Sequence, residues 1–118
     1  SNASSSNINP EKAQIDATAL IEKIEDKNWQ TTSKLLVKNI GAAEYASWVG
    51  KTEFKQYHNN CIYLQAQSKF IADWVSNRYT RKITDAWIAV TGQYATSVTV
   101  KPLTTMEASM QEGELAKC

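Results

Sequence analysis

Apolar residues recur at helical spacing in the first half of the chain. Trp29, Leu36 and Ile40 fall within about 40° of one another when successive residues are turned by 100°. This stripe predicts a helix over Asn28–Ile40, which the following glycine, Gly41, ends. A shorter helix is predicted next, over 42–49.

A weaker helical pattern precedes these two helices. Residues 11–27 carry four aliphatic side chains among charges, and Pro10 suits the first turn of a helix because it lacks an N–H. The pattern predicts a short helix here. Two roles are open for it, a helix that flanks the domain or a connector from a preceding domain.

Alternation with a period of two then replaces the helical pattern. Strands are predicted over Thr52–Tyr57 and Cys61–Ala66, with a turn at His58-Asn59-Asn60 between them. A last strand is predicted over Ser97–Lys101, before Pro102. The short link makes the first two strands an antiparallel hairpin, whereas the last strand arrives after a helical crossover.

The segment between the hairpin and the last strand has the strongest helical pattern. Ser68 is a suitable N-cap, and apolar side chains four apart continue to Gly92, so one helix is predicted over 69–90. The predicted order is helix, helix, strand, strand, helix, strand. This order indicates an α+β fold, with a three-stranded sheet packed against helices.

The charge distribution divides the chain into three parts. The formal net charge is +1, but residues 29–102 hold nine Lys or Arg and four acids, while each flank has two more acids than bases. All Trp, Tyr and Phe residues also lie between Trp29 and Tyr94. We therefore expect one core-forming domain over 29–102. Residues 1–28 are interpreted as a tag remnant, a linker and the possible flanking helix, and 103–118 as an acidic, disordered tail.

Composition argues against several classes of protein. There is no run of 18 apolar residues, and the cysteines, Cys61 and Cys118, are too few for a disulfide scaffold. His58 is the only histidine, so we expect neither a metal site nor a catalytic triad. The four glycines are isolated, which leaves no phosphate-binding loop. We expect a cytoplasmic domain without cofactor or enzymatic activity.

The predicted helix over 69–90 carries two neighbouring faces with large apolar groups. Phe70 and Trp74 lie beside Arg78 and Arg81, while Ile71, Val75 and Tyr79 form the next stripe. We expect Trp74 to pack under the two preceding helices, and Phe70 suits an exposed contact as well as burial. The basic residues Arg78, Arg81 and Lys82 suit a solvated face or contact with nucleic acid.

Several motifs in this order resemble the N-terminal domain family of the bacterial replication initiator DnaA. The resemblance covers about 29–101. The residues that carry it are Trp29, Leu36, Ile40, Glu44-Tyr45, Ser47-Trp48-Val49, Asn60–Ala66 and, most specifically, Lys69–Tyr79. Gln67 departs from the pattern, because the family usually has proline there. The residues before Trp29 also exceed the family's usual start.

The resemblance implies a K-homology-like fold and a non-catalytic interaction module. Such modules self-associate, dock the replicative helicase or regulatory replication proteins, and bind single-stranded DNA weakly. By position, the resemblance assigns partner docking to Glu44, Trp48 and Phe70, self-association to Trp29 and Leu35, and nucleic-acid contact to Lys69, Arg78, Arg81 and Lys82. The alternatives are a stand-alone nucleic-acid-binding module of K-homology type and an adaptor with an unrelated partner. No G-x-x-G clamp is present, so RNA binding by the usual K-homology route is not expected.

Overall fold

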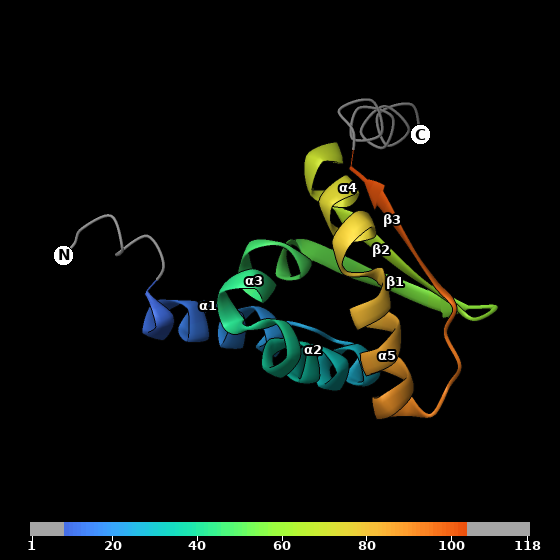
Figure 1. The fold of residues 1–118 in the computed structure, drawn as a ribbon, viewed down its shortest axis with the longest axis horizontal. Helices are drawn as coiled ribbons and strands as arrows, with labels where there is room; N and C mark the ends of the chain where they lie inside the picture. Colours follow the sequence, from blue (N-terminus) through green and yellow to red (C-terminus); the bar gives the residue numbers. More distant parts are fainter. Residues whose placement is uncertain (1–8, 104–118) are drawn as a thin grey trace, which may run out of the picture.

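The computed structural model describes residues 9–103, which form five helices, a 3₁₀ turn and three strands (Figure 1). In chain order these are α1 (Pro10–Glu22), α2 (Lys27–Ile40), α3 (Ala42–Ser47), the 3₁₀ turn (Val49–Lys51), β1 (Thr52–His58), β2 (Cys61–Ala66), α4 (Lys69–Arg78), α5 (Thr80–Thr91) and β3 (Ser97–Pro102). The predicted acidic tail lies outside the described residues, apart from Leu103.

The three strands form one mixed sheet in the order β1-β2-β3. β1 and β2 pair antiparallel, and β2 and β3 pair parallel, as a helical crossover requires. Asn59 and Asn60 form the hairpin turn with φ angles of 51° and 62°, a conformation that asparagine tolerates well. The predicted α+β fold with a three-stranded sheet against helices is confirmed.

Helix ends follow local capping chemistry. The Asp26 side chain accepts a hydrogen bond from the Trp29 N–H at 2.9 Å and so starts α2, and Ser68 caps α4 through the Ile71 N–H at 3.2 Å, as predicted. Gly92 ends α5 in the left-handed region with φ 74°, where a Cβ would add strain.

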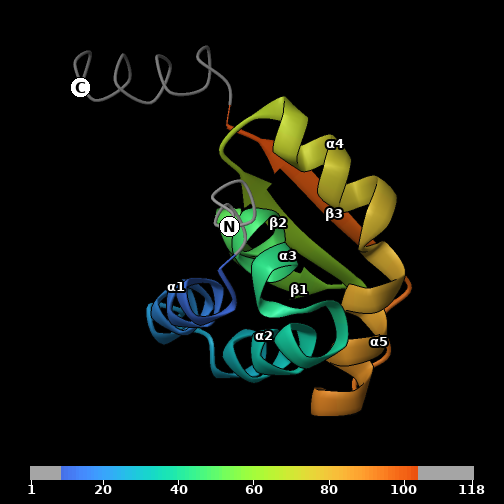
Figure 2. The ribbon, with the colours of Figure 1, turned by 60° about the vertical axis from the view of Figure 1, so that its left-hand side comes forward.

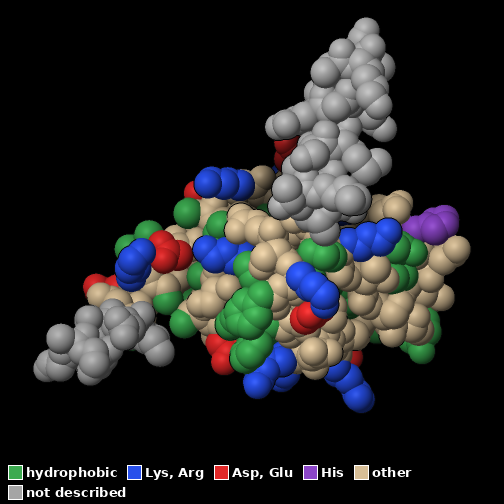
Figure 3. Space-filling model, turned by 90° about the horizontal axis from the view of Figure 1, so that it is seen from above, with side chains coloured by type: hydrophobic (Ala, Val, Ile, Leu, Met, Phe, Trp, Pro, Cys, Tyr) green, Lys and Arg blue, Asp and Glu red, His purple; other side chains and the backbone are tan. Residues whose placement is uncertain are grey.

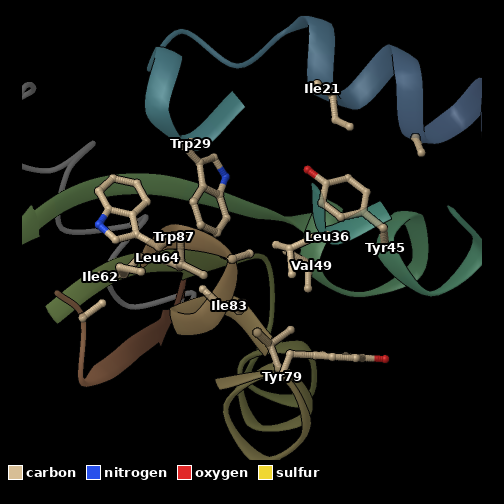
Figure 4. Close-up of a cluster of buried hydrophobic side chains, with 14 residues drawn as sticks. Ile21, Trp29, Leu36, Tyr45, Val49, Ile62, Leu64, Tyr79, Ile83 and Trp87 are labelled. Carbon is tan, nitrogen blue, oxygen red and sulfur yellow. The ribbon is translucent and has the colours of Figure 1, made fainter. Parts of the chain in front are cut away.

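The core lies between the helices and one face of the sheet (Figures 2 and 4). Its centre is an interior aromatic stack of Trp29, Phe54 and Trp87, with ring centroids 5.5 Å apart for Trp29–Phe54 and 5.7 Å for Phe54–Trp87. Ile62 and Leu64 of β2 are buried in the same cluster. These side chains join α2, α5 and the sheet into one unit.

The core also includes residues that precede the aromatic-rich part of the chain, Trp29–Tyr94. Ala17 and Ile21 of α1 are 0% and 6% exposed and belong to the same apolar cluster. The Gln30 side-chain amide donates to the Ile21 carbonyl at 3.1 Å, which ties α1 to α2. α1 therefore packs on the domain, and both roles predicted for this segment stay predictions.

The single long helix predicted over 69–90 is wrong, because the helix breaks at Tyr79. Tyr79 has φ −119° and ψ 2°, so it ends α4 and precedes α5. Its hydroxyl donates to a Glu44 carboxylate oxygen on α3. The break lets α4 pack on β3 while α5 turns toward α2. None of the described helices is long and apolar enough to cross a membrane.

Candidate partner-docking surface

A second group of aromatic side chains lies at the surface where α3 meets α4. This surface aromatic cluster consists of Trp48, Phe70 and Trp74. Trp48 stacks on Trp74 with centroids 4.4 Å apart and planes 16° apart, and its ring meets Phe70 nearly edge-on at 5.6 Å. The structure thus brings together two of the three residues predicted for partner docking.

Phe70 is the exposed member of this cluster. Its side chain is in the first turn of α4 and is 65% exposed, whereas Trp48 and Trp74 are half-buried. Arg78 places its guanidinium 4.3 Å from the centre of the Trp74 ring. Trp74 is therefore in contact with Trp48 and with Arg78, and Phe70 remains the ring best placed to contact another molecule.

Glu44, the third predicted docking residue, lies beside this cluster in α3. Its carboxylate accepts the hydrogen bond from the Tyr79 hydroxyl, yet the residue as a whole is exposed. Burial, with help from the Glu44 carboxylate, raises the pKa of Tyr79 to about 12. The bond fixes α3 against the junction of α4 and α5, and it holds Glu44 in place near Trp48.

The residues predicted for nucleic-acid contact do not form one stripe. Lys69 pairs with Asp73 at 2.8 Å, and Arg78 covers Trp74. Arg81 and Lys82 are exposed, but they lie on α5 beyond the break. Lys and Arg side chains are spread singly among apolar and polar groups on the face seen in Figure 3. The four residues are therefore divided between two helices, and their contact with nucleic acid stays a prediction.

The residues predicted for self-association lie mostly inside. Trp29 is 2% exposed, in the interior aromatic stack, so its ring does not present a surface. Leu35 is half-buried against the core. Self-association through these residues stays a prediction. Because the Trp29 ring is buried, a substitution there would affect self-association by changing how α2 packs on the core.

Two features of this surface, the position of Tyr79 and the packing of α1, do not follow from the sequence pattern. The sequence places Tyr79 only in the apolar stripe with Ile71 and Val75, because no pattern of neighbouring residues indicates its hydrogen bond to Glu44. The second feature is the packing of α1, whose Lys12 and Asp16 line a groove of about 310 Å³ together with Glu44 and Trp48 of the α3 region. The sequence indicates α1 only through Pro10 and the spacing of its aliphatic side chains. Among residues 9–103, no group of His, Cys, Asp or Glu side chains could hold a metal ion.

Fold and surface together define a small α+β domain with an exposed aromatic surface beside a carboxylate. The family described as "DnaA N-terminal domain" matches residues 26–89, which is more than half of the chain. The chain belongs to the DnaA N-terminal domain family, and it therefore carries a domain of DNA replication initiators.

Curated relatives agree with this assignment. The chain is 22% identical over 69 residues to the chromosomal replication initiator protein DnaA of Rhodopseudomonas palustris (strain TIE-1), covering 58% of this chain and 15% of that protein. It is 25% identical over 77 residues to the DnaA of Bartonella quintana (strain Toulouse), covering 65% of this chain and 16% of that protein. For the DnaA of Wolbachia pipientis wMel the identity is 29% over 59 residues, covering 50% and 13%. The chain thus spans about one seventh of the length of these relatives.

Proposed function

We propose that this domain is a non-catalytic docking module of a DnaA-type replication initiator, acting in the bacterial cytoplasm. It presents Phe70, flanked by Trp48 and Glu44, to a replicative helicase or a regulatory replication protein. The observation that carries this proposal is the 65% exposed Phe70 ring seated against Trp48. An exposed aromatic side chain on a rigid support is typical of residues that dominate the binding energy of interfaces.

Phe70→Ala tests this proposal against purified bacterial replicative helicase. We expect binding to weaken by about 30-fold or more, because an anchoring aromatic contributes about 2 kcal/mol. Ile15→Ala is the matched control, since Ile15 is 67% exposed on α1, away from the cluster. Equal binding of the Phe70 and Ile15 variants would contradict the proposal, as would a large loss of thermal stability in Phe70→Ala.

We propose a weaker contact with single-stranded DNA as a second function. It is supported by Phe70 as a ring on which a base can stack and by Arg78, Arg81 and Lys82 nearby in the chain. Binding should fall steeply with salt, by a log–log slope of about 0.7 for each phosphate contacted. No detectable binding of an oligothymidylate at low salt would contradict this contact and leave protein docking untouched.

Self-association is the third part of the proposal. A homodimer would use the α2 side of the domain, where Leu35 lies. Sedimentation equilibrium over a wide range of concentration tests it directly, and a monomer at every concentration would refute it.

A further inference from the structure

The groove between α1 and α3 adjoins the surface aromatic cluster at Trp48, and only its α1 wall lies outside the family's matched region. The family match begins at residue 26, after α1 has ended at Glu22. The groove is lined on one side by Lys12, Ala13 and Asp16 of α1. On the other side it is lined by Glu44 and by alanines of α3, and it ends at Trp48.

α1 is held firmly enough to form a wall of a binding surface. Ala17 and Ile21 anchor it in the core, and Asn9 caps its first turn through the Glu11 and Lys12 N–H groups. Close packing continues at Leu20, whose methyl group would lie 2.7 Å from a Cβ at Gly50. The position of Asp16 relative to Glu44 is therefore fixed by the fold.

The groove has an apolar floor and a mostly acidic rim. Ala13 of α1, together with Ala43 and Ala46 of α3, gives small side chains that let another backbone approach closely. The rim carries two carboxylates, Asp16 and Glu44. Its single ammonium, that of Lys12, is 3.1 Å from Asp16. Such a rim complements a basic side chain, and an alanine floor between two helices suits a helix laid into the groove.

We propose that this groove receives an amphipathic helix of a protein partner, with aliphatic side chains on the alanine floor and a Lys or Arg at Asp16 and Glu44. α1, which lies outside the family's matched region, then helps to determine which partner segment is accepted. The inference rests on the proposed docking function, because the groove and the exposed Phe70 share Trp48 as a common wall.

A phage-displayed library of amphipathic helical peptides tests the chemistry of the occupant without a named partner. Selection on the intact chain should enrich peptides with aliphatic residues at i and i+4 beside Lys or Arg. Enrichment of acidic peptides, or no enrichment at all, would overturn the proposal.

Charge reversal on the two sides of α1 tests the location. Asp16→Lys should weaken the selected peptides at least about tenfold, because it sets like charges against one another. Glu22→Lys makes the same change on the flank of α1 that faces α2, and it should leave affinity within about twofold. The difference between the two variants should shrink as salt is raised. Equal affinities of the two variants would overturn the proposal.

Filling the groove gives a test that does not depend on charge. Ala13→Leu should block peptide binding at all salt concentrations, whereas Ala19→Leu, on the exposed side of the same helix, should not. Thermal melts establish that each variant is folded. If Ala13→Leu melts early, the charge-reversal pair still decides the outcome.

Binding of purified replicative helicase separates this inference from the proposed function. If Phe70→Ala weakens helicase binding and Asp16→Lys does not, the groove proposal fails and the docking function stands. If Asp16→Lys weakens binding and Phe70→Ala does not, the groove is the docking site and the role of Phe70 fails. We expect both variants to weaken binding.

Discussion

The molecule contains two aromatic clusters of similar chemistry and different surroundings. In the interior stack, Trp29, Phe54 and Trp87 pack with centroids 5.5 to 5.7 Å apart along the stack, and both tryptophans are almost fully buried. In the surface cluster, Trp48 and Trp74 stack more closely, at 4.4 Å, yet both remain half-exposed beside the open Phe70 ring. Close stacking of rings therefore does not distinguish a core from an exposed surface.

The difference lies in what surrounds each cluster. The interior stack lies between α2, α5 and the sheet, and its two tryptophans exchange water for apolar neighbours almost completely, while Phe54 is half-buried against them. The surface cluster is held by α3 and α4 and bordered by Arg78 and Glu44. Burial makes the first cluster a source of stability, whereas the second cluster leaves the Phe70 ring open to solvent.

Removing an interior ring should have the largest effect. Trp87→Ala deletes a side chain that touches three other aromatic rings, and we expect the free energy of unfolding to fall by about 3–5 kcal/mol. A domain of this size has little more than that in total, so the variant should be largely unfolded at 25 °C. Urea titration followed by far-UV circular dichroism measures the change, with Trp87→Phe as the milder control. A loss below about 1 kcal/mol would contradict the assignment of this stack as the centre of the core.

The interior of the molecule was the more predictable part, because its signals are local. The stripe of Trp29, Leu36 and Ile40 placed α2, the alternation around Asn59-Asn60 gave the hairpin, and Ser68 marked the start of α4. The stripe, the alternation and the cap each depend on residues that are close together in the chain. Asp26 is a cap of the same kind, and it places the start of α2 one residue before the predicted one.

The surface was less predictable, because its geometry comes from contacts between distant segments. No proline or glycine marks the break at Tyr79. The break coincides with a bond to Glu44, which lies 35 residues away in the chain. The stacking of Trp48 on Trp74 and the burial of α1 are likewise tertiary effects. Only the family resemblance assigns Glu44 and Trp48 to docking, whereas the helical pattern also allows an exposed contact at Phe70. The assignment of all three residues to a partner stays a prediction.

Truncating a surface ring should cost clearly less than truncating an interior one. Trp48→Ala removes the stacking partner of Trp74 and one wall of the α1–α3 groove, and we expect a loss of about 1–2 kcal/mol with the fold retained. Trp48→Phe should keep most of the stability. The same urea titration measures both. A loss as large as that of Trp87→Ala would mean that the two clusters do not differ in the way proposed.

The hydroxyl of the buried Tyr79 donates a hydrogen bond to Glu44, which lies beside the surface cluster. The contribution of this hydrogen bond to the free energy of unfolding should depend on pH. Tyr79→Phe should cost about 1 kcal/mol at neutral pH, the usual value of a single hydrogen bond. The folded-state pKa of Tyr79, about 12, lies above the ordinary tyrosine value of 10, so the unfolded chain loses this proton first as pH rises. The stability that this shift contributes is fully present below pH 10 and is lost by about pH 12. The wild type should therefore lose its advantage over Tyr79→Phe in that window, as measured by paired thermal melts. A difference that stays constant from pH 8 to 12 would argue against the bond to Glu44.

The smallest expected effect on stability comes from removing Arg78, which covers one face of Trp74 in the surface aromatic cluster. Arg78 lies over Trp74 but is itself exposed, and an exposed cation–π contact is worth only about 0.5–1 kcal/mol. Arg78→Ala should therefore change the free energy of unfolding by no more than about 1 kcal/mol, while it uncovers one face of Trp74. Arg78→Lys keeps the charge and serves as the control. Uncovering the ring should raise the quenching of tryptophan fluorescence by acrylamide in Arg78→Ala, because Trp74 becomes more accessible while the exposure of the other three tryptophans is unchanged. Unchanged quenching would mean that Arg78 does not shield Trp74. The Trp74 ring would then be more accessible to solvent than the contact with Arg78 indicates.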